Sequence, residues 1–375
     1  MEYGIKKTFD IHISNQCKGI AIIWMMFHHL VPYTEFSGGP VLCGIYLPGV
    51  LGLTGKACVG IFLVLSGYGL YKSQNHYNSI FQFYSKRLKK IYLTYWIIFD
   101  LFTVIGILFF SGSFLYLTAD PFTRLENLLY SLSGMQYFIK NSGYMGYNSA
   151  WWYIGLCVLL YLLFPVLQKL LDKYPRCFLG GAILLCIFWR EQYCSFIMIR
   201  KLLQYLPLFA AGMLSAHYRI FERAGEKLAK KPKSSTAVIA GILIICIIVK
   251  YYVRNNVDIC LQLDCIISLL LLLEVYHLNN VSEGHTTAKI LTVLGSYSFE
   301  IYLIHLFITN MYTTMYIYSI NDAFWMVVVT LCASLLFAVP IQKLTSFLST
   351  RKALLNFALS GLLAAGILLS VYAGC

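Results

Sequence analysis

Long apolar runs recur along the whole chain, and this feature constrains its fold more than any other. A helix needs about 20 consecutive apolar residues to cross the hydrocarbon core of a bilayer. The runs are continuous rather than alternating, which argues against a transmembrane β-barrel. The sequence therefore predicts an all-α fold, a polytopic transmembrane helical bundle of ten or eleven spans. The spans are expected near 17–33, 50–71, 88–110, 150–171, 177–190, 200–218, 235–252, 258–278, 289–311, 323–342 and 354–373.

The composition agrees with a membrane protein. Hydrophobic residues make up 59% of the 375 residues and charged residues only 12%, whereas a soluble domain carries about 25% charged residues. The net charge of +13 could suggest a nucleic-acid partner. However, lysine and arginine lie in short loops between the apolar runs, where membrane topology places them. We therefore expect a lipid bilayer as partner and no nucleic acid.

The basic loops also predict an orientation. They lie at 72–90, 169–176, 219–233 and 343–352. Cytoplasmic loops carry an excess of lysine and arginine. Eleven spans place all four loops in the cytoplasm if the N-terminus is inside and the C-terminus outside. We expect a multi-pass protein of the cell membrane with a cytoplasmic N-terminus.

The loops are too short to hold a soluble domain. The sequence predicts one membrane-embedded domain over residues 1–375, with a core at 14–345 and an extra C-terminal span at 354–373. Most of the 12 cysteines lie within apolar runs, and none forms a CxxC pair. We therefore expect no metal site and no disulfide framework.

The first apolar run contains a cation and a pair of histidines. Lys18 and His29 are 11 positions apart, which at about 100° per residue places them on one face of a helix. Ionisable residues inside a membrane span are costly and usually line a site or a pathway. An imidazole can accept a proton from a hydroxyl group or carry an acyl group. We predict that His29 is catalytic with His28 beside it; the alternative is a histidine that only packs between helices.

Other polar residues are candidates for binding. Arg87 and Lys90 are neighbours on one helix face and suit a phosphate group, although membrane topology and anionic lipid headgroups also explain them. Lys56 either points toward His29 or snorkels to the surface. Tyr302 and His305 lie one helical turn apart, and their pairing is either functional or a polar contact between helices.

Together these segments resemble the acyltransferase 3 family of integral membrane acyltransferases, from about Lys18 to Lys343. The matching positions are Lys18, Gly19 and His29 in the first span, Phe62 to Tyr68 with Ser66 in the second, Arg87 and Lys90 at the third, Trp152, Tyr161 and Pro165 in the fourth, and Gly295, Ser298, Tyr302 and His305 in the ninth.

Three positions depart from the family pattern. Lys18 stands where many members have arginine, so a bidentate contact becomes a point-charge contact. Leu93 stands where proline is usual. Cys157 stands where many members have glutamate, so the role of that carboxylate is not carried over. The extra final span is similar to that of members that continue into an SGNH-type hydrolase domain, which is not expected here because nothing follows Cys375.

The resemblance implies a membrane O-acyltransferase. It would move an acetyl or short acyl group from acyl-CoA, as a cosubstrate rather than a bound cofactor, to a hydroxyl of a cell-surface or secreted carbohydrate. His29 would be the base or acyl carrier. Substrate-binding residues would be Lys18, Lys56, Ser66, Tyr68, Arg87, Lys90, Trp152, Tyr161, Tyr302 and His305. The alternative is a transporter or channel that uses the same polar residues without covalent chemistry.

Overall fold

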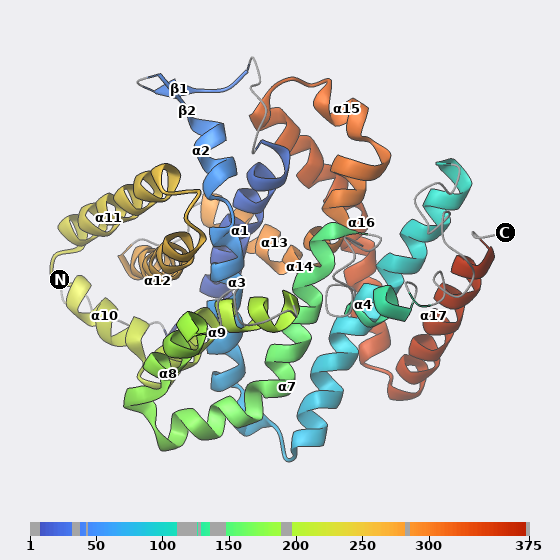
Figure 1. Ribbon diagram of the computed structural model, residues 1–375, viewed down its shortest axis with the longest axis horizontal. Helices are drawn as coiled ribbons and strands as arrows, with labels where there is room; N and C mark the ends of the chain where they lie inside the picture. The colour runs from blue at the N-terminus through green and yellow to red at the C-terminus, as the bar shows by residue number, and fades with distance from the viewer. Residues whose placement is uncertain are drawn as a thin grey trace.

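The computed structural model describes residues 8–31, 38–42, 44–110, 126, 129–135, 148–188, 197–281 and 286–372. These residues are almost all helical (Figure 1). The long helices are α1 (Ile11–Leu30), α2 (Leu47–Thr54), α3 (Ala57–Lys72), α4 (Ile80–Phe109), α7 (Trp152–Lys173), α8 (Pro175–Phe188), α9 (Ile197–His217), α10 (Ile220–Leu228), α11 (Pro232–Tyr252), α12 (Val257–Val281), α13 (Thr286–Ser296), α14 (Ser298–Leu306), α16 (Ala323–Ser349) and α17 (Lys352–Tyr372).

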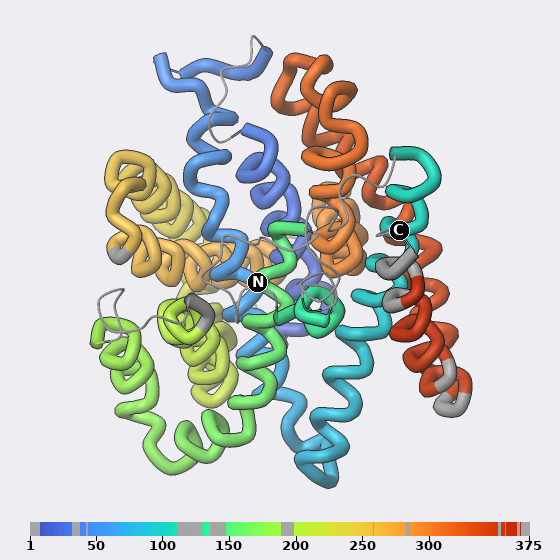
Figure 2. The backbone as a smooth tube through the Cα atoms, turned by 45° about the vertical axis from the view of Figure 1, so that its right-hand side comes forward, coloured from blue at the N-terminus to red at the C-terminus, as the bar shows by residue number. Residues whose placement is uncertain are grey.

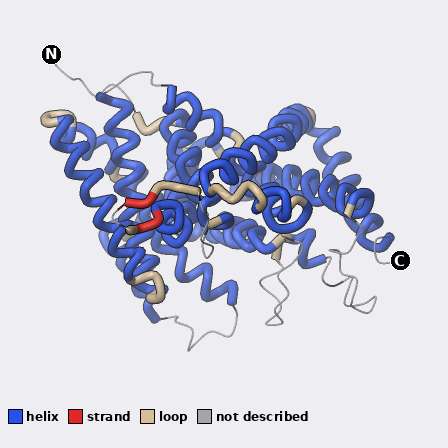
Figure 3. Tube along the Cα trace, turned by 90° about the horizontal axis from the view of Figure 1, so that it is seen from above, coloured by secondary structure: helices blue, strands red, loops and turns tan. Residues whose placement is uncertain are grey.

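Shorter elements lie between these helices. They are η1 (Gln74–His76), η2 (Ser149–Trp151), the π-helical turn η3 (Phe307–Tyr312) and α15 (Thr314–Tyr318). Strands β1 (Val41–Leu42) and β2 (Ile45–Tyr46) pair antiparallel, with Val41 opposite Tyr46. From above, Figure 3 shows this ribbon as a small addition to a molecule built of helices.

The prediction of an all-α membrane protein is confirmed. Among the described residues, five helices are long and apolar enough to cross a membrane: 80–109, 149–173, 232–252, 259–281 and 323–349. Two bent pairs raise this number to seven if each pair is one span. Every predicted apolar run coincides with a helix or a bent pair. The count of ten or eleven spans and the cytoplasmic N-terminus stay predictions.

Local sequence signals set where several helices begin. The Asp10 carboxylate accepts hydrogen bonds from two first-turn N–H groups of α1, at 2.9 and 3.0 Å. Ser79 caps α4 at 3.1 Å and Asp322 caps α16 at 3.0 Å in the same way. These side chains satisfy N–H groups that the first turn of a helix leaves without a partner.

The run predicted at 50–71 is a bent pair, with α2 and α3 meeting at 47°. Such a break leaves the last carbonyl groups of α2 without helical partners. Side chains from other helices satisfy them: Trp24 Nε1 donates to Leu51 O at 3.0 Å, His28 Nδ1 to Gly52 O at 2.8 Å and Lys250 Nζ to Thr54 O at 2.8 Å. The break is therefore fixed by contacts that no local sequence pattern reveals.

Helices α13 and α14 form the second bent pair, at 66°. Gln342 of α16 donates a hydrogen bond to Ser296 O at this bend, at 2.6 Å. Close packing holds α13 against α1, since a Cβ atom on Gly19 would collide with the Leu291 backbone and one on Gly295 with the Asn15 backbone. The two glycines thus allow the helix backbones to touch.

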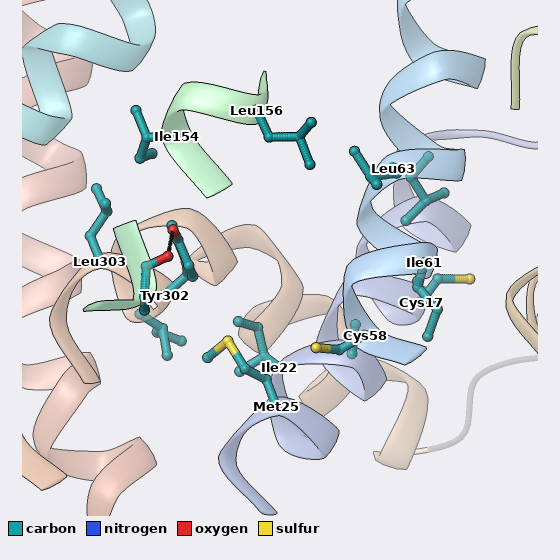
Figure 4. Close-up of a cluster of buried hydrophobic side chains, with 14 of the residues drawn as sticks. Cys17, Ile22, Met25, Cys58, Ile61, Leu63, Ile154, Leu156, Tyr302 and Leu303 are labelled. Atoms are coloured by element: carbon teal, nitrogen blue, oxygen red, sulfur yellow. Dashed lines mark hydrogen bonds between the residues drawn. The ribbon is translucent and has the colours of Figure 1, made fainter. Parts of the chain in front are cut away.

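Helices α1 and α3 form the centre of the molecule (Figure 1). Helices α11 and α12 lie on one side, and α4 and α17 on the other. Figure 4 shows part of the buried core, where side chains of α1, α3, α7 and α14 lie near one another; the labelled ones are Cys17, Ile22, Met25, Cys58, Ile61, Leu63, Ile154, Leu156, Tyr302 and Leu303.

The four basic loops meet at one end of the molecule. Tyr71 donates to Asp172 at 2.7 Å, which joins the ends of α3 and α7. Lys72 pairs with Glu222 of α10 at 3.4 Å, and Lys89 donates to Asn356 of α17 at 2.7 Å. Figure 2 shows the turns after α3 and α7 at the lower end and the β1–β2 ribbon at the upper end. We call the end formed by the four basic loops the basic end.

Candidate active site

Three histidine rings meet between α1 and α14. The His29 ring lies 5.1 Å from His28 and 4.9 Å from His305, measured between ring centroids. The sequence separates His305 from His29 by most of the chain, so the fold creates this cluster. We call His28, His29 and His305 the histidine cluster.

Backbone carbonyls fix two of these rings. His28 contacts Gly52 O through Nδ1 at 2.8 Å, and His305 contacts Tyr302 O through Nδ1 at 2.7 Å. A carbonyl oxygen only accepts, so Nδ1 carries the hydrogen in both histidines. The described residues offer the His29 ring no hydrogen bond. His29 is thus the member of the cluster that no backbone carbonyl holds in this way.

Contacts from the start of α7 hold α14 in place. The Tyr302 hydroxyl donates to Ala150 O, the interaction drawn as a dashed line in Figure 4. Trp151 Nε1 donates to Leu303 O at 3.1 Å. The Leu303 carbonyl is available because the helix changes to a π-helical turn at Phe307. These bonds fix the turn that carries His305.

A row of polar side chains on α7 leads away from the histidine cluster. The Tyr153 ring lies 5.7 Å from the Tyr302 ring, and its hydroxyl interacts with the Cys157 thiol. Tyr161 follows one turn later, where Ser66 donates to its hydroxyl at 3.4 Å. Residues four positions apart share a helix face, so this α7 row spans about 12 Å along the axis.

The α7 row ends near Arg87, at the basic end. Arg87 is close enough to interact electrostatically with Tyr161. It donates to Ser73 at 2.9 Å, and its guanidinium lies 5.7 Å from the centre of the Tyr77 ring. Its Nε is buried and has no hydrogen-bond partner. Arg87 therefore keeps a donor that an anionic ligand could use.

Lys18 lies at the other end of the α1 face that carries His29. Its ammonium group donates to Asn15 at 3.3 Å and is close enough to Lys90 for the two charges to interact. Lys90 also interacts with Glu300 of α14. The Lys18 end of the predicted face thus lies near α4, and the His29 end lies against α14.

Three predicted binding residues remain: Lys56, Trp152 and Tyr68. Lys56 is exposed at the break of α2 and α3 and interacts electrostatically with His28. The Trp152 ring carries the Lys201 ammonium group 4.1 Å from its centre. Tyr68 lies apart from the histidine cluster, because its hydroxyl donates to buried Glu222 at 3.4 Å.

Comparison with known proteins decides the family. The acyltransferase 3 model, described as an acyltransferase domain, matches residues 11–343. The chain belongs to this family. No curated protein and no solved structure matches it.

The family match makes the protein a multi-pass membrane acyltransferase, as the resemblance implied. Its model covers about the same residues as the predicted core of 14–345. The prediction of a single domain over the whole chain stays a prediction.

Sequence reasoning missed several residues near the site of this acyltransferase. Tyr153 is not among the predicted site residues, although its spacing from Cys157 and Tyr161 is a detectable signal. Lys250 and Asp264 form a buried ion pair on α11 and α12, beside the break that His28 caps. The two residues lie on different helices, so only the fold reveals the pair.

The histidine cluster contains no carboxylate. Within the described ranges, the ionisable side chains that act on His29 are His305 and His28. No group of three or more His, Cys, Asp or Glu side chains there could hold a metal ion. The imidazole rings of the cluster can move a proton or donate a hydrogen bond.

Proposed function

We propose that this acyltransferase moves an acetyl or short acyl group from acyl-CoA to a hydroxyl of a cell-surface or secreted carbohydrate. The observation that carries the proposal is the position of His29, whose ring lies between two histidines that backbone carbonyls hold in place. An imidazole at this position can take up the proton of a reacting hydroxyl group and release it again.

The donor binds first at the basic end. The CoA moiety carries phosphate groups, and guanidinium and ammonium groups are their usual protein partners. Arg87 supplies an open buried donor, while Lys18 and Lys90 repel each other and gain from an anion between them. In the predicted orientation this end faces the cytoplasm, where acyl-CoA is made.

The acyl arm of the donor then extends along the α7 row toward the histidine cluster. The row combines aromatic faces with hydroxyl and thiol groups, which suits an arm with alternating amide and methylene groups. Tyr302 and Tyr153 lie where the thioester would end.

The reaction at His29 is a balanced exchange. The acceptor oxygen forms a bond to the acyl carbon, and the bond between that carbon and the CoA sulfur breaks. His29 takes the hydroxyl proton and returns it to the departing thiolate, which leaves as CoA thiol. In the second mechanism, His29 itself carries the acyl group before the acceptor attacks.

Mass spectrometry of surface glycans tests the proposal in cells with and without the protein. Acyl-modified sugars are expected only in cells that carry it, and His29→Ala should abolish them because general-base catalysis contributes about 10²–10⁴-fold. Undiminished acylation in the His29→Ala strain, at equal protein level in the membrane, would remove His29 from the mechanism.

A further inference from the structure

His305 has a ring nitrogen that the fold leaves unsatisfied. The side chain is completely buried, at 0% exposure. Nδ1 bonds to Tyr302 O at 2.7 Å, whereas Nε2 is buried without a hydrogen-bond partner. Buried polar atoms nearly always have partners, and exceptions often have a functional role.

The tautomer of His305 follows from this geometry. Since the Tyr302 carbonyl can only accept, Nδ1 carries the hydrogen and Nε2 carries a lone pair. The His29 ring lies against it at 4.9 Å between centroids. An imidazole nitrogen lies about 1 Å from its ring centre, so this separation is compatible with nitrogen atoms about 2.7–3.2 Å apart after a small rotation. Such bonds often tighten only when the substrate binds.

We propose that His305 is a positioning residue that orients His29 for acyl transfer. Nε2 of His305 accepts the N–H of His29, so the other nitrogen of His29 presents its lone pair to the acceptor hydroxyl. When His29 takes the hydroxyl proton, the positive charge is shared with His305. A carboxylate performs this task in Ser-His-Asp sites, and here an imidazole replaces it. The inference rests on the proposed function.

Other side chains are poorly placed for this role. Cys157 interacts with Tyr153 and is not a carboxylate. The His28 ring also lies close to the His29 ring, at 5.1 Å, but unlike His305 it has no buried ring nitrogen left without a partner. Its Nδ1 already caps Gly52 at the break.

Two substitutions test the hydrogen-bond acceptor Nε2 independently of the rest of the His305 side chain. In His305→Gln, the amide group reaches the position of Nε2 and can accept from His29. In His305→Asn, the shorter amide reaches only the position of Nδ1, so it can bond Tyr302 O but not His29. Both variants remove the imidazole, so a loss caused by altered packing affects both.

A matched control exists on α12. His277 is also completely buried, with Nε2 bonded to Pro232 O at 3.2 Å and Nδ1 without a partner. His277→Gln keeps the bonded side and removes the unpartnered nitrogen. It therefore controls for replacing a buried imidazole away from the histidine cluster.

The experiment uses the full chain in nanodiscs, with acetyl-CoA as donor and surface glycan from cells lacking the protein as acceptor. His305→Asn should lower kcat about 100-fold with little change in KM for acetyl-CoA, and His305→Gln should stay within about tenfold of the parent. His277→Gln should match the parent. Equal losses in the Asn and Gln variants, or parental kcat in His305→Asn, would overturn the proposal.

A second measurement does not depend on catalysis. Histidine labelled with ¹⁵N reports which ring nitrogen carries the hydrogen. We expect an Nδ1–H signal for His305, and a shift of the His29 signals in His305→Asn but not in His277→Gln. If His29→Ala abolishes transfer while His305→Asn leaves the His29 signals unchanged, the positioning role fails and the proposed function stands. If His29→Ala is fully active, the proposed function fails whatever the spectra show.

Discussion

Arg87 uses only part of its hydrogen-bonding capacity within the protein. It bonds Ser73 and lies over Tyr77, while Nε has no partner. We expect Arg87→Gln to raise KM for acetyl-CoA about 10–100-fold, because a hydrogen bond to a charged group contributes about 1.5–3 kcal/mol. The KM of Arg87→Lys should lie between those of the parent and Arg87→Gln, since lysine keeps the charge but loses the planar fork of the guanidinium group.

Lys86 provides the control for Arg87. It is exposed in the same basic loop and lies 5.6 Å from the centre of the same Tyr77 ring. Lys86→Gln should leave KM within about twofold, because an exposed charge contributes little. Equal KM values for Arg87→Gln and the parent would show that the guanidinium group does not contribute to donor binding.

Single residues show where the sequence is informative. The spacing of Lys18 and His29 predicts a shared face, and the structure places both on α1 with α4 and α14 opposite. The approach of His305 to His29 depends on the bend between α13 and α14, which Gln342 of α16 helps to fix. No periodicity within either segment contains that information.

At the scale of the helix, close packing of α1 on α13 is the most demanding contact. A Cβ atom on Gly295 would collide with the Asn15 backbone. Gly295→Ala should therefore lower stability by at least about 1–3 kcal/mol, because backbone atoms must move apart. Thermal unfolding of the detergent-solubilised protein measures the effect.

Gly241 on α11 is the matching control, since nothing lies within 4 Å of a Cβ atom there. Gly241→Ala should be neutral or stabilise by about 0.5–1 kcal/mol, as alanine is the better helix former. If both variants unfold at the same temperature, the close approach of α1 and α13 is wrong.

The buried Lys250–Asp264 pair fixes the break between α2 and α3. Lys250→Met alone should destabilise the protein by about 3–5 kcal/mol, because it leaves Asp264 charged and unpaired in the interior. The double variant Lys250→Met with Asp264→Leu should be less destabilised than Lys250→Met alone. A double variant as unstable as the single one would show that the bond to Thr54 O, rather than the ion pair, dominates.

Helices also show which part of the fold was predictable. Hydropathy is a local property, so every apolar run coincides with a helix or a bent pair. The bends were not predictable, because their carbonyl groups are capped by Trp24, His28 and Lys250 from other helices. The depth of each helix in the bilayer depends on packing between helices, whereas hydropathy does not. The exact number of spans could therefore not be predicted from the sequence.

At the scale of the whole molecule, the four basic loops gather at one end, as the positive-inside rule requires. We expect that end to face the cytoplasm. Lys230, Lys231 and Lys233 are exposed there. A membrane-impermeant amine reagent should label them in opened cells and leave them unlabelled in intact cells. Equal labelling of these lysines in intact and opened cells would contradict this orientation.

The decisive measurement places purified protein in vesicles, with acetyl-CoA on the side of the basic end and surface glycan from cells lacking the protein on the other. We expect loss of the thioester and formation of acetylated glycan, and we expect neither with His29→Ala. Movement of unmodified solute across the vesicle without thioester loss would contradict it, and would favour a transporter.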